Sequence, residues 1–570
     1  MNGRLRSLLA EVYGPERARE LSPRVEDLVA AWGNPCRAPR PWVDERDVIL
    51  ITYGDSIVEP DRPPLATLRE VAGRRLGGAI GSIHLLPMYP YTSDDGFSVV
   101  DPRGIRPEIG DWGAVERLAE AFDLMFDTVV NHLSVSSEAF RRYLDGDPAY
   151  DDYFIEREEG RDYSAVVRPR AVPLFTEFEG RQGKKLVWTT FSPDQADLNY
   201  RNPKVLLDIL DLLCFYASRG ARYIRLDAVG FIWKEPGTSC LNLPQTHAIV
   251  KLFRAVLDLV APGVILVTET NVPLAENLAY FGDGRDEAGL VYQFSLPPLV
   301  LHSFVRVDAE TLLDWMESLG NSAPSPSASY LNFLSSHDGI GLRPVEGILS
   351  IKEMEGLVAA CVERGGLVGY RHADGREVPY ELNINYMDAL SPPEATDSER
   401  AARNAAAHGI LLSAMGVPAI YVHALLGSRN WDEGVRSSGI KRRINRERIG
   451  RSRLESELDE PGGLRGAVFG SIMRLVEARR RIPAFAPDAA QRVIRLDRRL
   501  VALERESADG RSRVLAIANV SGEEVQADAG FGGIDALTGA ALGPRIAVPP
   551  FGVVWLVAGS SGRGGAGEEG

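Results

Sequence analysis

Short apolar runs recur along most of the chain, each separated from the next by a longer stretch of mixed character. Such nearly continuous runs are typical of strands that are buried on both faces. Eight of them are residues 48–53, 81–86, 124–130, 223–229, 264–270, 290–294, 331–335 and 417–422. Apolar positions at helical spacing occur at residues 5–28, 204–219 and 248–260. This alternation predicts an α/β fold, a (β/α)8 barrel.

Two long stretches interrupt the alternation. Residues 133–199 are charged and aromatic, and they predict an inserted domain after the third strand. Residues 340–405 open with a segment rich in glycine and proline, which predicts a second, irregular loop insertion. Residues 1–132 then hold the N-terminal helices and the first part of the barrel, and residues 200–482 hold the rest of it.

The pattern changes after a predicted helix at residues 467–481. A small antiparallel β domain is expected over residues 483–558, because alternating or β-branched runs there are separated by turns. The runs are residues 493–496, 499–506, 513–518 and 553–557. Residues 559–570 are mostly glycine, serine and glutamate, a composition typical of a disordered tail.

Charge and cysteine content narrow the possible partners. The net charge of −15 argues against a nucleic acid or an anionic membrane as partner, because both attract basic surfaces. The four cysteines are scattered with no CxxC pair, so neither a zinc site nor a dense disulfide framework is expected. No secretory signal or membrane-spanning run is evident. We therefore expect a cytoplasmic enzyme with reduced thiols, either a monomer or a homodimer.

Three of the apolar runs end in a carboxylate. They deliver Asp227 in Arg225-Leu226-Asp227, Glu269, and Asp338 in His337-Asp338. Since the carboxyl ends of barrel strands meet at one rim, these acids are expected to converge there. Several acids around one carbon suit glycosyl transfer through an oxocarbenium-like transition state. Each acid alone could instead belong to a structural ion pair or a helix cap.

The local contexts suggest different roles for the acids. Arg225 lies two residues before Asp227 on the same strand face, so it could keep that carboxylate ionised as a nucleophile requires. Glu269 follows an aliphatic run and could be desolvated, which would raise its pKa as a general acid requires. A separation of about 5–5.5 Å between Asp227 and Glu269 would mean retention of anomeric configuration, and a much wider one inversion.

Here the sequence resembles a known family. Four blocks look like the signature regions of the α-amylase superfamily: residues 127–132, residues 225–227, Glu269 and residues 337–338. The resemblance covers essentially the whole chain from about residue 49 to residue 558. The resemblance implies a nucleophile at Asp227, an acid/base at Glu269 and a transition-state stabiliser at Asp338. It also implies that Arg225, His132 and His337 support the first sugar. It implies no metal and no organic cofactor.

A narrower resemblance surrounds these blocks. Residues 91–97, 225–234, 237–247 and 332–341 look like the sucrose phosphorylase branch of the superfamily. The resemblance implies that Asp94, before the pair Gly96-Phe97, and Arg446 clamp the O4 and O6 end of a glucosyl unit. The enzyme would then be a retaining glycoside phosphorylase, which transfers one terminal glucosyl unit to inorganic phosphate and yields α-D-glucose 1-phosphate.

A loop at residues 369–376 is a candidate for binding that phosphate. Arg371, His372 and Arg376 could meet an anion, and Gly375 could act as a hinge. No P-loop or dinucleotide-binding pattern occurs, which favours inorganic phosphate or a small phosphorylated substrate over a nucleotide. The alternative is an ordinary solvated loop.

One difference from the sucrose phosphorylase sequences points to the leaving group. Asn271 stands two residues after Glu269, where sucrose phosphorylases usually have histidine. Residues 379–383 and 427–430 look like the subgroup that acts on glucosylglycerate, glucosylglycerol or sucrose 6-phosphate. Two of these leaving groups are anionic, and Arg429, with the arginines of the loop above, would suit them.

We favour glucosylglycerate as the substrate, although Leu274 and Asn242 replace histidines that are common at these positions in relatives. Sucrose, sucrose 6-phosphate and glucosylglycerol remain alternatives. The first rival activity is an α-glucosidase or transglucosidase on the same barrel. The second is a catalytically silent barrel used for binding, which would be expected to lack at least one of the three acids.

Overall fold

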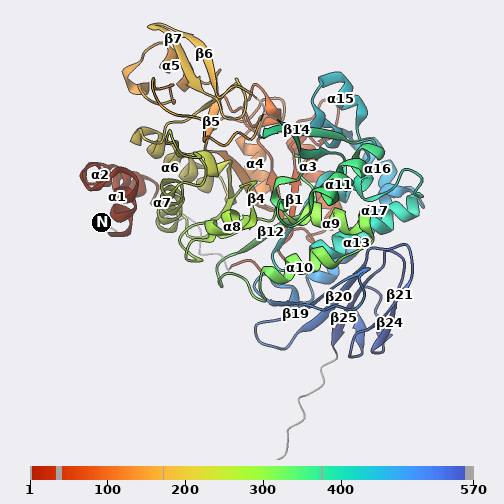
Figure 1. Ribbon diagram of the computed structural model, residues 1–570. Coiled ribbons are helices and arrows are strands. Elements are labelled where there is room, and N and C mark those ends of the chain that lie inside the picture. Colours follow the sequence, from red (N-terminus) through yellow and green to blue (C-terminus); the bar gives the residue numbers. More distant parts are fainter. Residues whose placement is uncertain (1–2, 34–41, 171, 374–375, 559–570) are drawn as a thin grey trace, which may run out of the picture.

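The computed structural model describes residues 3–33, 42–170, 172–373 and 376–558. Its centre is a closed barrel of eight parallel strands surrounded by helices (Figure 1), as the apolar runs predict. The strands, in barrel order, are β1 (Ile49–Thr52), β16 (Val417–Tyr421), β12 (Ser329–Phe333), β11 (Leu290–Tyr292), β10 (Ile265–Thr268), β9 (Ala221–Asp227), β4 (Asp123–Val129) and β3 (Ser82–Leu85).

The strand register brings the carboxyl ends of three neighbouring strands together. Asp127 of β4 pairs with Arg225 of β9, and Val129 pairs with Asp227. On the other side of β9, Val267 of β10 pairs with Arg225, so β10 ends beside Asp227. The side chains of the barrel strands are almost all buried, which explains their lack of polar alternation.

Helices cover the outside of the barrel. α6 (Pro203–Ser218) and α7 (Pro244–Val260) each begin with proline at the first helical position, and the side chain of Asn202 caps α6 by accepting from the backbone of Lys204. The N-terminal helices α1 (Gly3–Tyr13) and α2 (Pro15–Trp32) pack on α7 at one edge of the molecule (Figure 1). Helix α1 buries residues at positions 5, 8, 9 and 12, which is one helical face.

The segment after β4 leaves the barrel, as expected because it lacks the alternation of apolar runs and helical stretches. It holds α5 (Glu138–Leu144), a hairpin of β6 (Phe175–Gly180) and β7 (Gly183–Trp188), and a small sheet of β5 (His132–Ser134) and β8 (Gln195–Asp197). Pairing of His132 with Asp197 returns the segment to the barrel rim. The hairpin projects at the opposite end of the molecule from the C-terminal strands (Figure 1).

The expectation of an irregular segment from residue 340 is wrong. This part contains α11 (Ile351–Glu363), a three-stranded sheet and two further helices. The sheet consists of β13 (Ile340–Gly341), β15 (Arg376–Asn383) and β14 (Leu367–Ala373), and the helices are α12 (Tyr386–Leu390) and α13 (Asp397–Ser413). The sequence did not predict these strands, because β15 is buried over only part of its length. Its polar residues hide the alternation of apolar and polar positions that is typical of a strand.

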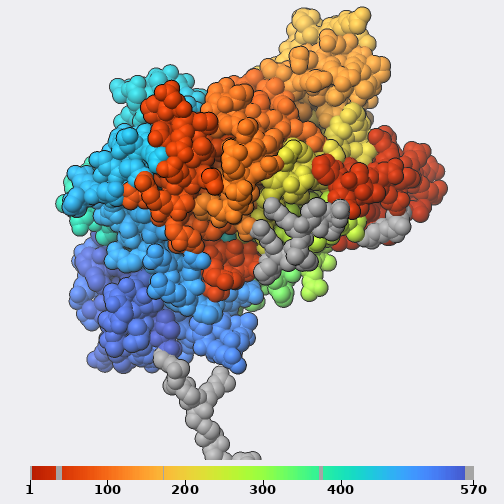
Figure 2. Space-filling model, turned by 180° about the vertical axis from the view of Figure 1, so that it is seen from behind, coloured from red at the N-terminus to blue at the C-terminus, as the bar shows by residue number. Residues whose placement is uncertain are grey.

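The C-terminal strands form two packed sheets. Strands β18 (Ala490–Val493), β19 (Leu500–Glu506), β20 (Arg513–Asn519), β25 (Val553–Ala558), β22 (Gly533–Asp535) and β23 (Ala541–Leu542) form one sheet, and β21 (Val525–Asp528) pairs with β24 (Arg545–Val548). The first strand lies three residues earlier than the predicted run at 493–496. Figure 2 shows this region, in dark blue, against the light-blue segment that includes α17 (Leu464–Arg479).

The predicted tail at residues 559–570 lies outside the described residues. Across the described ranges, every helix is too short or too polar to cross a membrane.

Candidate active site

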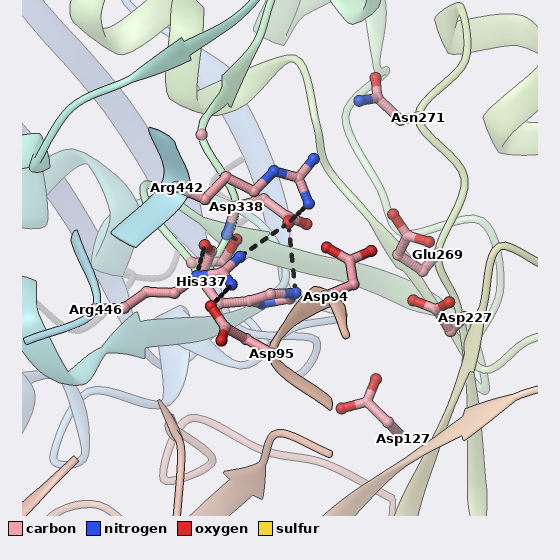
Figure 3. A network of polar contacts seen from close by, with 12 residues as sticks. Asp94, Asp95, Asp127, Asp227, Glu269, Asn271, His337, Asp338, Arg442 and Arg446 are labelled. Carbon is pink, nitrogen blue, oxygen red and sulfur yellow. Dashed lines mark hydrogen bonds and ion pairs between the residues drawn. The ribbon is translucent and has the colours of Figure 1, made fainter. Parts of the chain in front are cut away.

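A cavity of about 1200 Å³, measured with its open mouth, lies at the carboxyl ends of the barrel strands. Asp227, Glu269 and Asp338 all line it, although they come from three different strands (Figure 3). The other predicted lining residues are Asp94, Phe97, His132, Asn271 and His337. Sequence-distant acids therefore face one hollow that is large enough for a small glycoside.

Arg225 lies beneath the acids and holds them together. Its Nη1 donates to Asp227 Oδ1 at 2.8 Å and also pairs with Asp127, and its Nη2 is 3.8 Å from Glu269 Oε2. The pairing of Asp127 with Arg225 across two strands, and the two-residue spacing to Asp227, put these charges on one face. Arg225 is almost completely buried, so its charge acts with little screening from water.

The turn after β9 fixes the position of Glu269. Ala228 has a left-handed backbone with φ of 52°, which is unusual for a residue with a Cβ. Its backbone N–H donates to Glu269 Oε2 at 3.0 Å. Because strain of this kind persists only where the surroundings enforce it, the turn is a positioning device for the carboxylate.

The electrostatics separate the three acids. Burial raises the pKa of Asp227 and of Glu269, and the attraction of Arg225 opposes the rise in both. Burial also acts to raise the pKa of Asp338, but Arg442, His337 and Arg446 outweigh it and hold that pKa below its usual range. Asp338 is therefore a permanent anion, while the neighbouring pair readily retains a proton.

Two buried histidines line the same space as neutral groups. Burial lowers the pKa of His132 to about 4 and that of His337 to about 3. His132 Nε2 donates to the carbonyl oxygen of Phe97 at 3.0 Å, and the Phe97 ring stacks on His337 with centroids 4.7 Å apart. Neutral imidazoles in this setting suit hydrogen bonding to sugar hydroxyls.

The clamp expected of Asp94 and Arg446 stays a prediction, and the charge of Arg446 is one of several that lower the pKa of Asp94 against the effect of burial. Arg446 donates to Asp95 Oδ2 at 2.7 Å and to the carbonyl oxygen of His337 at 2.7 Å, and its Nη2 is 3.8 Å from Asp338 Oδ1. Asp94 lines the cavity and accepts from Arg170 at 2.8 Å. The arginine that faces the cavity from the late segment is Arg442 (Figure 3).

Arg442 joins the barrel to the insertion. It forms an ion pair with Asp338 Oδ1 at 2.5 Å and donates to both oxygens of Glu381 at 2.8 and 3.1 Å. Asp94 lies close enough for its charge to raise the pKa of Arg442 further, after the effects of Asp338 and Glu381. The only sequence signal for Arg442 was the basic run Lys441-Arg442-Arg443, which does not tell which side chain points inward.

Comparison with known proteins fits this geometry. The family "Alpha amylase, catalytic domain" matches residues 76–343. A glucosylglycerate phosphorylase of Spirochaeta thermophila is 47% identical over 525 residues, which cover 91% of this chain and 89% of that protein. A glucosylglycerate phosphorylase of Escherichia coli is 44% identical over 570 residues, or 98% of this chain and 100% of that protein.

The chain belongs to the α-amylase family, in its sucrose phosphorylase branch. Among solved structures, sucrose 6F-phosphate phosphorylase from Thermoanaerobacter thermosaccharolyticum superposes with a TM-score of 0.72 at 25% identity. The match covers 83% of this chain and 94% of that one, so the fold similarity extends beyond the catalytic barrel.

Two of the arginines predicted to bind an anion lie elsewhere in this family member. Arg371 pairs with Glu346 at 2.8 Å, and Arg429 pairs with Asp388. Neither arginine is among the described residues that line the cavity. His372 belongs to β14, but its side chain is outside the described part. Arg376 opens β15 at an exposed position.

Several lining residues were missed by the sequence reasoning. Arg170 and Gln195 come from the inserted segment, where no periodic pattern pointed to them, and Tyr380 comes from the unpredicted hairpin. Gln195 Nε2 donates to the Phe97 carbonyl at 3.3 Å and lies 3.1 Å from His132. In the described ranges, no three His, Cys, Asp or Glu side chains group so that they could hold a metal ion.

Proposed function

We propose that this protein is a retaining glycoside phosphorylase that converts glucosylglycerate and inorganic phosphate to α-D-glucose 1-phosphate and glycerate. The observation that carries the proposal is the similarity, at 44–47% identity over nearly the whole chain, to two proteins named glucosylglycerate phosphorylase. The cavity supports it, because Asp227, Glu269 and Asp338 all line one hollow and Arg225 contacts Asp227 directly.

In the first step, the Asp227 carboxylate attacks the anomeric carbon while Glu269 gives a proton to the departing oxygen. Burial and mutual repulsion favour one shared proton on these two acids. The direct contact of Arg225 with Asp227, at 2.8 Å against 3.8 Å to Glu269, favours the negative charge on Asp227 and the proton on Glu269. Anionic Asp338 stabilises the positive charge that develops on the ring.

In the second step, a phosphate oxygen attacks the glucosyl–Asp227 ester, and Glu269, now ionised, accepts the phosphate proton. Retention follows from the two successive inversions. Asp94, Arg442, His132 and His337 all line the cavity, and in this mechanism Asp94 and Arg442 hold the non-reducing end of the sugar while the neutral histidines bind its hydroxyls. A site closed at that end would remove one terminal glucosyl unit and exclude the interior of a polymer.

A phosphorolytic enzyme needs a compartment with abundant inorganic phosphate. Its product, glucose 1-phosphate, is charged and crosses membranes poorly, so it stays in the membrane-enclosed compartment in which it forms. This reasoning favours the cytoplasm as the site of action.

The test is incubation of the purified protein with a panel of α-glucosides, with and without phosphate. We expect glucose 1-phosphate and glycerate from glucosylglycerate, in equal amounts and only when phosphate is present. Sucrose 6-phosphate belongs in the panel because the structure with a TM-score of 0.72 carries that name, and sucrose and glucosylglycerol complete it. Free glucose as the product, at a rate that does not depend on phosphate, would show a glucosidase instead.

A further inference from the structure

One of the arginines lining the cavity has a free side chain. Arg170 is engaged by Asp94 at 2.8 Å, and Arg442 is engaged by Asp338 and Glu381. Arg343 is half-buried at the start of the 3-10 turn η5 (Arg343–Val345), and within the described part of the chain its guanidinium makes no ion pair or hydrogen bond.

The acids that could have neutralised Arg343 have other partners. Glu346, three residues further along the chain, accepts from Arg371 at 2.8 Å. Glu381, on the hairpin wall of the cavity, accepts twice from Arg442. A half-buried cation that is left unpaired costs free energy, and the cost is recovered when an anion binds.

Arg343 belongs to the side of the cavity where the acid/base lies. A Cβ placed on Gly341, two residues before it, would lie 3.2 Å from the side chain of Asn271, which follows Glu269 by two residues. The N–H of Leu342 donates to the carbonyl oxygen of Tyr380 at 2.9 Å, and Asn271 Nδ2 donates to the Tyr380 hydroxyl at 3.4 Å. Arg343, Asn271 and Tyr380 therefore surround one region next to Glu269.

A second unused group marks the same region. Asn271 Oδ1 is buried and has no hydrogen-bond partner among the residues that the structure describes. Buried acceptors in proteins are almost always hydrogen-bonded, so an orphan that lines a cavity indicates a ligand with a donor group. A free cation beside a free acceptor fits a small molecule that carries both an oxyanion and a hydroxyl group.

We propose that Arg343 is the specificity-determining residue that binds the oxyanion of the acceptor, first the carboxylate of departing glycerate and then inorganic phosphate. This inference rests on the proposed function and deepens it. Both groups must bond to the same carbon beside Glu269, so they use the same space in turn. In the second step the Asp227–C1 bond breaks, the C1–O bond to phosphate forms and the proton passes to Glu269. The planar guanidinium can hold either anion through two parallel hydrogen bonds.

The experiment uses α-D-glucosyl fluoride as donor, because its leaving group carries no carboxylate or phosphate. The glucosyl-enzyme is then offered glycerate, phosphate, glycerol or water, and each product is quantified for the wild type and for Arg343→Gln. We expect transfer to glycerate and to phosphate to fall on the order of 30-fold, as for the loss of a charged hydrogen bond. Transfer to glycerol and hydrolysis should change little, since neither acceptor is an anion.

Three further variants distinguish the role of Arg343 from that of other positive charges. Arg343→Lys keeps the charge without the fork and should recover part of the transfer to both anions. Arg474→Gln removes one positive charge from an exposed position on α17 and serves as the matched control. Arg371→Gln tests the rival arginine: loss of anion transfer there, with Arg343→Gln unaffected, would overturn the inference.

Other outcomes also decide the matter. An equal loss with all four acceptors would mean a structural role for Arg343, and a loss with one anion alone would refute the shared site. Failure of the proposed function looks different, because it shows in the wild type: fluoride would be released but no glucose 1-phosphate would form from phosphate.

Discussion

At the scale of single residues, Glu269 is needed only when the leaving group must be protonated, whereas Asp227 is needed for every leaving group. Glu269→Gln should lower kcat/KM for glucosylglycerate by about 10²- to 10⁴-fold, because the departing alkoxide then receives no proton. Fluoride leaves without protonation, so release of the first equivalent from α-D-glucosyl fluoride should persist in this variant. Asp227→Asn should abolish both reactions, because it removes the nucleophile.

Rapid-quench measurement of fluoride, together with steady-state glucose 1-phosphate formation, checks this separation. The isosteric amides keep the shape of the cavity, and near-ultraviolet circular dichroism of the two variants serves as the folding control. Loss of fluoride release in Glu269→Gln to the same extent as in Asp227→Asn would refute the assignment of Glu269 as the acid.

The raised pKa of Glu269 also predicts a pH-dependent cost in stability. Burial favours the protonated form in the folded state, so its pKa there exceeds the ordinary value of 4.5. Below pH 4.5 both folded and unfolded forms are protonated and the cost vanishes; above the folded pKa the cost is fully present. Glu269→Gln should therefore raise Tm at pH 8, on the order of 1–2 °C, and lose this gain near pH 4.5.

Calorimetry of the wild type and Glu269→Gln across this pH range measures the difference. Glu276→Gln is the control, since this glutamate lies on the neighbouring helix α8 (Leu274–Leu278) and is solvent-exposed. A Tm difference that stays constant with pH would show that the variant acts through packing and not through the desolvated charge.

The local pattern of the sequence predicted site residues where a strand controlled their direction, and the others were expected only from the family resemblance. Asp227 and Glu269 follow apolar strands, and a barrel sends every strand end to one rim. Arg442 and Arg446 share one short 3-10 segment and its flank, where the direction of each side chain depends on the exact turn. Arg442, which the sequence did not single out, lines the cavity, and the role of Arg446 stays a prediction.

At the scale of elements, the start of α11 carries a helix-capping motif, although the composition of the surrounding segment predicted an irregular loop. Ser350 accepts from the N–H of Glu353 at 3.3 Å, and Glu353 accepts from the N–H of Ser350 at 2.8 Å, which is a capping box. Ser350→Ala should destabilise the start of α11 by about 1 kcal/mol. Faster hydrogen exchange over the first turn of the helix, measured by mass spectrometry, is the expected result.

Ser350→Thr is the control, because threonine caps nearly as well. Unchanged exchange in Ser350→Ala would mean that packing of α11 against α9 (Leu296–Arg306) and β14 holds the first turn without the cap. Activity should stay near that of the wild type in both variants, since Ser350 is exposed and lies away from the cavity lining.

The degree of burial explains which strands could be predicted from the sequence. Each barrel strand is buried on both faces, so its apolar run is continuous and easily recognised. Strand β15 begins exposed and becomes buried only toward Asn383, so its pattern resembles a polar loop. The missed hairpin nevertheless supplies Tyr380 and Glu381 to the cavity, because binding residues often lie on insertions at the barrel rim.

At the scale of the whole molecule, one hydrophobic core joins the barrel to the C-terminal sheet. Phe485 packs on Trp555 with ring centroids 4.7 Å apart, and both belong to the same buried cluster as the barrel strands. Buried Arg505 of β19 donates to the carbonyl oxygen of Ser413, at the end of α13, at 2.8 Å. The sheet is thus expected to unfold together with the barrel in one transition.

A matched pair of glycine substitutions tests this coupling. Gly409 lies inside α13 against β25, and a Cβ there would lie 2.8 Å from Cγ2 and 3.0 Å from Cγ1 of Val553. Gly356 lies inside α11, where a Cβ would meet nothing within 4 Å. Gly356→Ala should raise stability by about 0.5–1 kcal/mol through backbone entropy, whereas Gly409→Ala should lower it because the stiff valine cannot move aside.

If the core is continuous, the lower Tm of Gly409→Ala applies to the whole molecule, and activity is lost in the same temperature range as the heat absorption. Differential scanning calorimetry and residual activity after heating measure the two. An early, separate transition with activity retained would mean that the C-terminal sheet unfolds alone. A rise in Tm equal to that of Gly356→Ala would mean that α13 and β25 separate readily, which the buried contacts of Trp555 and Arg505 argue against.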